Sequence, residues 1–277
     1  MASVKTIIRI SADRHERLRQ FLADLWDYRE LFWTFVERDI KVRYKQTALG
    51  VIWVVLQPLL MTAVFTLIFG KLAGMPSEKL PYAVFALAGL VPWNFFSGAL
   101  TRGGVSLVNS AQLISKVYFP RLIMPVASVM GGLLDFLVVF VFLIGLMFFY
   151  GLVPTAAVIW LPFFLLVAIA TALGVSFWLS ALNVRYRDVN YLIPFMAQFW
   201  MFATPVVYPA SMIPDRWRLL YGLNPMVGVV EGFRWALFGT GEGPGWMMLV
   251  SIVMVVILLT TGILVFRKME RTFADVV

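Results

Sequence analysis

Six long apolar stretches constrain this chain more than any other feature, because five of them carry no charge and the sixth carries one. Each has about 18 or more residues, which is the length that a helix needs to cross the hydrocarbon core of a bilayer. They cover residues 47–70, 82–101, 122–150, 156–182, 191–208 and 246–266. The pattern predicts an all-α integral membrane protein with six transmembrane helices.

The basic residues indicate how these helices are oriented. Six spans place both ends of the chain on one side, which then carries eighteen lysine and arginine residues against five on the other side. Cytoplasmic loops are enriched in lysine and arginine, so we expect both termini in the cytoplasm. The chain divides into a cytoplasmic amino-terminal region (1–46), a six-helix transmembrane domain (47–266) and a cytoplasmic tail (267–277).

Residues 25–44 have the pattern of an amphipathic helix. Apolar side chains recur at helical spacing, among them Phe32, Phe35 and Val36, and charged side chains lie opposite them. We expect this helix to lie on the cytoplasmic membrane surface, either as a simple anchor or as an interface for another protein.

Residues 223–238 are apolar but too short to span a bilayer, and they begin with Asn-Pro. Glu231 and Arg234 are three positions apart, so they share one helix face and can pair. We predict a re-entrant or interfacial half-helix on the outer side, paired with residues 209–222. Such irregular backbone is tolerated at membrane depth only where protein or a wet cavity surrounds it.

The residue types exclude several functions. The chain has no cysteine and a single histidine, His15, so we expect no cysteine nucleophile and no metal site. The phosphate-binding pattern G-x-x-x-x-G-K-[ST] is absent, as are H-E-x-x-H and G-x-S-x-G. Asp135 is the one acidic residue within the six stretches, whereas ion-coupled carriers usually have several. The net charge of +8 follows from the cytoplasmic basic residues, so no nucleic acid partner is expected.

Three basic stretches next to the spans carry a more specific signal. They read ERDIKVRYKQTALGVIWVVLQPLL (37–60), LISKVYFPRLIMP (113–125) and NVRYRDVNYLIPFMAQFWMFATPVVYP (183–209). Together with the six-span plan, they closely resemble the permease subunits of ATP-binding-cassette exporters for polysaccharides and polyol phosphates. This is the O-antigen, capsule and teichoic acid export family of the type-two ABC transporter class. The resemblance runs from about residue 30 to the tail.

The resemblance implies a homodimer in the bacterial inner membrane that works with two copies of a separate ATPase subunit. ATP and magnesium would be bound by that partner, and no cofactor by this chain. The implied substrate is a lipid-linked glycan, such as one carried on undecaprenyl diphosphate, and membrane lipids surround the permease. The amphipathic helix at 25–44 matches the family's interface helix.

The resemblance also places ATPase coupling in the loop between the second and third spans. Apolar side chains there suit a groove in the ATPase, while Lys116 and Arg121 would grip its rim. Pro120 is expected to end the helix and stiffen the loop. The predicted coupling residues are Leu113, Ile114, Lys116, Val117, Tyr118, Phe119, Pro120 and Arg121.

Basic residues near the cytoplasmic membrane surface are candidates for binding a lipid diphosphate, because guanidinium groups form forked hydrogen bonds with phosphate. They are Arg38, Arg43, Arg185 and Arg187. Asp188 would orient one of them or cap the fifth helix. The alternative is that these arginines only follow the charge bias of cytoplasmic loops or contact lipid phosphates.

Phe195, Phe199 and Phe202 recur at helical spacing in the fifth span, and aromatic rings suit contact with sliding sugars. An interfacial aromatic belt or lipid-facing packing explains them equally. For Asp135 a structural hydrogen bond between helices is favoured over contact with substrate.

The function that these observations favour is export of a lipid-linked polysaccharide. A teichoic acid, a glycolipid or a drug is an alternative cargo. A membrane glycosyl- or phosphotransferase, or a secondary carrier, is the alternative of another class. Copurification with an ATPase would distinguish the classes.

Overall fold

The structure is a computed structural model that describes residues 26–45, 50–117, 119–240, 243, 245–270 and 273. Its regular elements over these residues are all helices, as the sequence predicts. In chain order they are α2 (Arg29–Lys45), α3 (Gly50–Phe65), η1 (Thr66–Leu72), α4 (Tyr82–Asn109), α5 (Ala111–Lys116), α6 (Ile123–Met130), α7 (Leu133–Phe149), η2 (Ala156–Trp160), α8 (Leu161–Arg185), α9 (Val189–Phe202), η3 (Ala210–Met212), α10 (Asp215–Gly222), α11 (Pro225–Phe238) and α12 (Trp246–Glu270).

Within the described residues, five helical stretches are long and apolar enough to cross a membrane. They are Ile52–Leu72, Tyr82–Asn109, Ile123–Phe149, Ala156–Arg185 and Trp246–Glu270, and they match five of the predicted spans. The predicted span at 191–208 is different, because its helix α9 has 14 residues and ends at Phe202. The predicted end of that span is therefore wrong, and a total of six spans stays a prediction.

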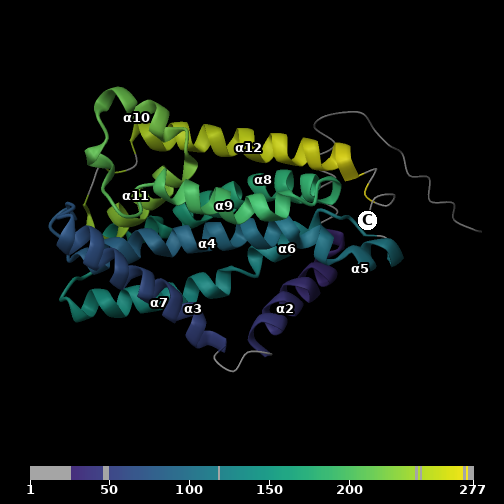
Figure 1. The fold of residues 1–277 in the computed structure, drawn as a ribbon, viewed down its shortest axis with the longest axis horizontal. Coiled ribbons are helices and arrows are strands. Elements are labelled where there is room, and N and C mark those ends of the chain that lie inside the picture. The colour runs from purple at the N-terminus through teal and green to yellow at the C-terminus, as the bar shows by residue number, and fades with distance from the viewer. Residues whose placement is uncertain are drawn as a thin grey trace, which may run out of the picture.

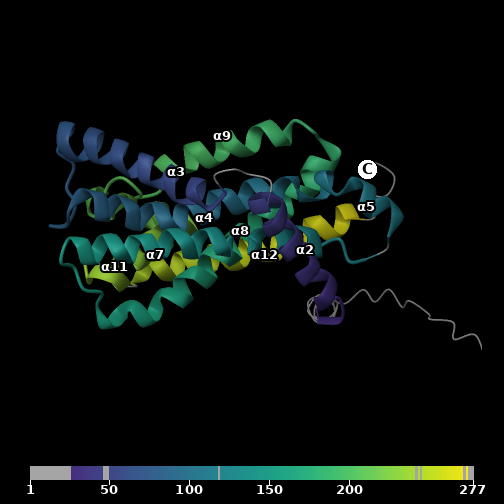
Figure 2. The same cartoon turned by 90° about the horizontal axis from the view of Figure 1, so that it is seen from below.

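Helix α4 lies at the centre of the bundle and is buried over most of its length. It packs against α8, α6, α7, α11 and α3, while α12 packs on the far side of α8 (Figures 1 and 2). One end of the bundle carries α5 and the last turn of α12, and the opposite end carries α10 and α11 (Figure 1). We call these the α5 end and the α10 end.

Two glycines allow α8 and α12 to approach closely. A Cβ atom on Gly262 would collide with the carbonyl oxygen of Gly174, and one on Gly174 would lie 2.9 Å from backbone atoms of Leu258 and Leu259. Membrane helices commonly use small residues in this way, because close backbones gain van der Waals contact. This contact fixes the position of α12 relative to the core.

The third predicted span consists of two helices in line. Helix α6 ends at Met130, and α7 begins at Leu133 after two glycines. The guanidinium group of Arg102, from α4, occupies the space where a Cβ atom of Gly132 would be. The break between α6 and α7 therefore makes room for a charged side chain inside the bundle.

The α10 end contains a short helix, α11, where the sequence predicts a half-helix, and its re-entrant or interfacial position stays a prediction. Helix α11 is buried against α4, α8 and α12 over nearly all of its residues. Asn224 caps it, since its Oδ1 atom accepts a hydrogen bond of 3.1 Å from the backbone N–H of Met226. Pro225 follows at the first helical position, where a missing N–H is harmless.

The chain leaves helix α9 just before Pro205, which disfavours a helical residue ahead of it. The turn at 203–208 leaves backbone carbonyl groups without helical partners, and such groups must be paired if they lie at membrane depth. Three side chains donate hydrogen bonds to four of these carbonyls. Asn224 Nδ2, at the cap of α11, donates to Ala203 at 3.0 Å, and Tyr82 Oη of α4 donates to Val207 at 2.5 Å. Arg234 of α11 donates through Nη1 to Pro205 at 2.6 Å and through Nη2 to Val206 at 2.7 Å. Irregular backbone is thus enclosed by protein.

Candidate coupling and transport site

The segment Ala111–Arg121, which we call the coupling segment, has an exposed face and a buried face. Lys116 and Val117 are exposed and available to a partner. Ile114 and Phe119 are buried in the chain's own core, and the Phe119 ring packs on Phe35 of α2. The prediction that these two side chains are open to a groove of another protein is wrong, because they complete the core at the α5 end.

The structure also locates other predicted coupling residues. Leu113 is half-buried, and Tyr118 lies outside the described residues. Helix α5 ends four residues before Pro120, so the proline does not terminate it. The guanidinium group of Arg121 is turned toward the end of α12, where Nη1 lies 2.5 Å from the backbone oxygen of Glu270. Arg121 therefore binds the end of this chain's own α12. Its contact with the rim of a partner's groove stays a prediction.

Helix α2 packs its apolar stripe against the bundle. Phe35 and Val36 are buried and Phe32 is half-buried, and the rings of Phe35 and Phe119 are 5.6 Å apart. The predicted helix is present, but the stripe that we expected on the membrane surface contacts α6 instead. On its outer face, α2 exposes Trp33.

Asp135 holds together α2, α4 and α7. Arg43 pairs with Asp135 Oδ2, the Tyr44 hydroxyl donates to Oδ1, and Arg102 Nη1 lies 3.6 Å from Oδ2. Burial raises the pKa of Tyr44, and the hydrogen bond with Asp135 raises it further, so the hydroxyl stays protonated and donates. The hydrogen bond between helices that we favoured for Asp135 is present. Arg43, which we predicted to bind a diphosphate, is held in this ion pair.

A second polar contact fixes α2 one turn earlier. Asp39 accepts a hydrogen bond of 3.0 Å from the Ser128 hydroxyl of α6, and Arg38 Nη2 lies 2.8 Å from Asp39 Oδ1. The Arg38 guanidinium also lies over the Phe35 ring, 5.1 Å from its centroid. The interface helix is therefore tied to the bundle by charge as well as by apolar packing.

Asp135 and its partners form one wall of a cavity of about 570 Å³ bounded by α3, α4, α7 and α9. The lining combines polar side chains with aromatic ones. It includes Arg43, Trp53, Gln57, Asn94, Phe95, Ser97, Thr101, Arg102, Asp135, Pro194 and Ala197. Uncharged polar groups beside aromatic rings suit the hydroxyl groups and apolar faces of sugars.

The spacing of polar residues in the second span could have indicated this cavity, although the overall composition could not. Asn94, Ser97 and Thr101 recur every three to four residues, so they share one face of α4. A polar stripe on an otherwise apolar span indicates a face turned toward other protein or a wet cavity. Arg102 continues this stripe, although the predicted span ends at residue 101.

The turn between α8 and α9 presents the remaining predicted diphosphate ligands. Arg185, Arg187 and Asp188 are exposed, and Arg185 lies over the Tyr186 ring, 5.4 Å from its centroid. Within the described part of the chain, the Asp188 carboxylate makes no ion pair and does not cap α9. Asp188 is the residue that precedes α9, but only its backbone carbonyl bonds to the helix, accepting from Tyr191 at 3.0 Å.

Phe195, Phe199 and Phe202 lie on the exposed face of α9, with 65%, 69% and 51% of their surface accessible. The α9 residues that line the cavity are instead Pro194 and Ala197. The three rings are therefore outside the cavity of the single chain, and their proposed role in a channel stays a prediction.

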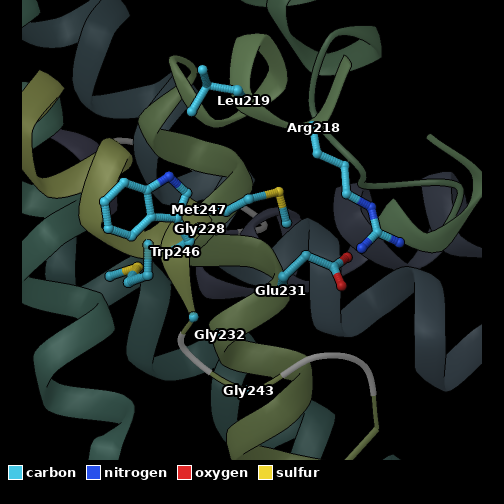
Figure 3. Close-up of a pocket in the computed structure, with 10 residues that line it drawn as sticks. Arg218, Leu219, Gly228, Glu231, Gly232, Gly243, Trp246 and Met247 are labelled. Atoms are coloured by element: carbon cyan, nitrogen blue, oxygen red, sulfur yellow. The ribbon is translucent and has the colours of Figure 1, made fainter. Parts of the chain in front are cut away.

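The α10 end has a smaller pocket of about 380 Å³ between α10, α11 and the start of α12. Figure 3 shows Arg218 and Glu231 on the same side of it, facing Trp246 and Met247 across the pocket. Glu231 Oε1 accepts a hydrogen bond of 2.9 Å from Arg234, the pairing that the three-residue spacing predicts. This carboxylate therefore anchors Arg234.

No group of three or more histidine, cysteine, aspartate or glutamate residues within the described residues could hold a metal ion.

Comparison with known proteins identifies relatives along most of the chain. A model of the ABC-2 type transporter family matches residues 30–238. The O-antigen export system permease protein RfbA of Myxococcus xanthus is 30% identical over 259 residues, which cover 92% of this chain and 98% of that protein. RfbA of Klebsiella pneumoniae is 30% identical, covering 89% and 95%. The polysialic acid transport protein KpsM of Escherichia coli is 22% identical, covering 84% and 91%.

Proposed function

The chain belongs to the ABC-2 type transporter family, and on this premise we propose that it is the membrane permease of an ATP-driven exporter of a lipid-linked, O-antigen-like glycan. The main support is the 30% identity to O-antigen export permeases along nearly their whole length. The polar and aromatic cavity between α3, α4, α7 and α9 supports the same proposal, because a sugar chain needs polar partners inside a membrane.

In this proposal two copies of the chain form the permease in the inner membrane, with both termini in the cytoplasm. Two copies of an ATPase subunit bind ATP and magnesium and dock on the exposed face of the coupling segment, where Lys116 and Val117 are accessible. Arg185 and Arg187 sit on the same cytoplasmic side and contact the diphosphate of the carrier lipid. Phe195, Phe199 and Phe202 line the passage formed between the two copies.

Reconstitution tests the proposal. The permease and its proposed ATPase partner are incorporated into liposomes that contain undecaprenyl diphosphate-linked glycan. We expect the glycan to stimulate ATP hydrolysis, and ATP to move the glycan to the opposite leaflet, where a lectin detects it. Movement without ATPase, or a new covalent product made by this chain alone, would favour a carrier or a transferase instead.

A matched pair of variants locates the docking face. Lys116→Glu reverses a charge on the exposed face of the coupling segment, and Gln112→Glu adds a charge one turn earlier on another exposed position. We expect Lys116→Glu to reduce copurification of the ATPase at least fivefold and Gln112→Glu to have a smaller effect. Full copurification with both variants would place the docking face elsewhere.

The likeness to KpsM supports a second cargo, an acidic polysaccharide of the capsule kind. Adding such a glycan to the same liposomes separates the two cargoes, because only the transported glycan stimulates ATP hydrolysis.

A further inference from the structure

The coupling segment is attached to the end of α12, which is far from it in sequence. Arg121 makes two hydrogen bonds to Glu270. Its Nη1 atom donates to the Glu270 carbonyl at 2.5 Å, and its backbone N–H donates to Glu270 Oε1 at 3.2 Å. The Arg121 guanidinium also lies 5.9 Å from the centroid of the Phe273 ring. One arginine thus holds two residues that lie at and beyond the last turn of α12.

Phe273 anchors this contact in the core. It lies three residues after Glu270 and is only 1% exposed. Its ring packs edge to face on Phe266 with centroids 5.4 Å apart, and Phe266 packs on Phe177 of α8 at 5.9 Å. A continuous row of aromatic contacts therefore connects the coupling segment to α12 and α8.

The opposite side of the coupling segment is held by α2. Phe119 is 3% exposed, and its ring lies 5.6 Å from that of Phe35. The segment is therefore clamped between α2 on one side and the end of α12 on the other. Closely packed interiors have low compressibility and transmit displacement, whereas a loose loop would absorb it.

We propose that Arg121, Glu270 and Phe273 are positioning residues that make the end of α12 part of the mechanical link between the ATPase and the transmembrane helices. This inference rests on the proposed function. Displacement applied at the exposed face of α5 reaches α12 through Arg121 and the Phe273 ring. From α12 it reaches α8 through the close contact at Gly174 and Gly262. Helices with no direct contact to the ATPase thereby move with the coupling segment.

The test measures three quantities in the assembled complex: retention of the ATPase, the rate of ATP hydrolysis, and glycan exported per ATP hydrolysed. For Phe273→Ala we expect retention and hydrolysis within twofold of wild type and export per ATP reduced at least fivefold. Phe273→Leu keeps an apolar side chain in the core and should restore at least half of the export. Arg121→Gln should resemble Phe273→Ala.

Lys268→Gln is the matched control, because Lys268 is exposed on the same turn region of α12 and should leave all three quantities unchanged. Wild-type export per ATP in both Phe273→Ala and Arg121→Gln would overturn the inference. Equal loss of folded protein, ATPase retention and export in these variants would also overturn it, since the residues would then serve folding alone. If wild-type protein retains no ATPase, the proposed function fails instead, so the two failures are distinguishable.

Discussion

Replacing Arg234 by methionine tests how the irregular turn at the α10 end is stabilised. Methionine keeps an unbranched apolar stem, so the change removes the guanidinium group with little loss of packing. Arg234 is fully buried and its guanidinium lies 3.6 Å from the centroid of the Phe85 ring. It donates to Glu231 at 2.9 Å and to the carbonyls of Pro205 and Val206 at 2.6 and 2.7 Å.

The loss of stability can be worked out from the groups that lose the Arg234 guanidinium as a partner. Removing one member of a buried ion pair costs about 3–5 kcal/mol, because the other charge is left without a partner. Two buried carbonyl groups that lose their donors add about 1–3 kcal/mol each. The methionine variant no longer buries a charged guanidinium group, and the desolvation cost that it avoids offsets several kcal/mol of this loss of stability. We expect Arg234→Met to lower the free energy of unfolding by about 4 kcal/mol, a large part of the roughly 5–15 kcal/mol of a typical protein.

The measurement is a titration of purified protein in mixed micelles with sodium dodecyl sulfate, followed by tryptophan fluorescence. The double variant Arg234→Met/Glu231→Gln removes the unpaired carboxylate and should recover about 2 kcal/mol. Arg216→Met is the control, because Arg216 is exposed on α10 and should change the free energy by less than about 0.5 kcal/mol. An Arg234→Met protein within about 1 kcal/mol of wild type would refute the reasoning.

Three further predictions concern the rest of the bundle. Asp135→Asn should destabilise the protein by about 2 kcal/mol, since Asp135 is partly buried. A double-mutant cycle with Arg43→Gln in the same titration should give a coupling energy of about 1–2 kcal/mol. Additive effects would mean that the two side chains do not interact. Gly262→Ala should cost about 1–3 kcal/mol, because its Cβ atom meets an α8 carbonyl, and an unchanged unfolding midpoint would contradict the close approach of α8 and α12. The chain has no cysteine, so single cysteines report orientation directly: in intact cells an impermeant maleimide should label Lys79→Cys but not Ser115→Cys, and the reverse labelling would invert the proposed topology.

The long helices were predictable because a membrane-spanning helix must form all of its backbone hydrogen bonds internally and must contain few charged residues. Five of the predicted stretches correspond to continuous or in-line helices in the structure. The end of the span at 191–208 was not predictable in this way. Its last residues form a turn whose carbonyls bind Asn224, Arg234 and Tyr82, and a turn enclosed by protein is as apolar in sequence as a helix.

The candidate site was predictable where partners are close in sequence. Glu231 and Arg234 are three positions apart, and helix geometry alone suggested their pairing. Asp135 was correctly expected to form a hydrogen bond between helices, but Arg43 and Arg102 lie on other helices, and hydrophobic periodicity does not specify which helices meet.

The coupling segment shows a different limit of prediction from sequence. The apolar character of Ile114 and Phe119 indicated that both would be buried, but burial against the same chain and burial against a partner leave the same pattern in a sequence. The structure buries both in the chain's own core, and the exposed face is limited to a few residues around Lys116 and Val117.

The short helix α9 has a consequence for the lipid around it. Its 14 residues extend about 21 Å, whereas the hydrocarbon layer is about 30 Å thick. Lipid lying against its outer face, which Figure 2 places at the edge of the bundle, would have to thin locally, at a cost that grows with every ångström of mismatch. A second protein surface has no such thickness to match. The flank beside α9 is therefore poorly matched to a bilayer of ordinary thickness, and a protein surface would suit it better than lipid.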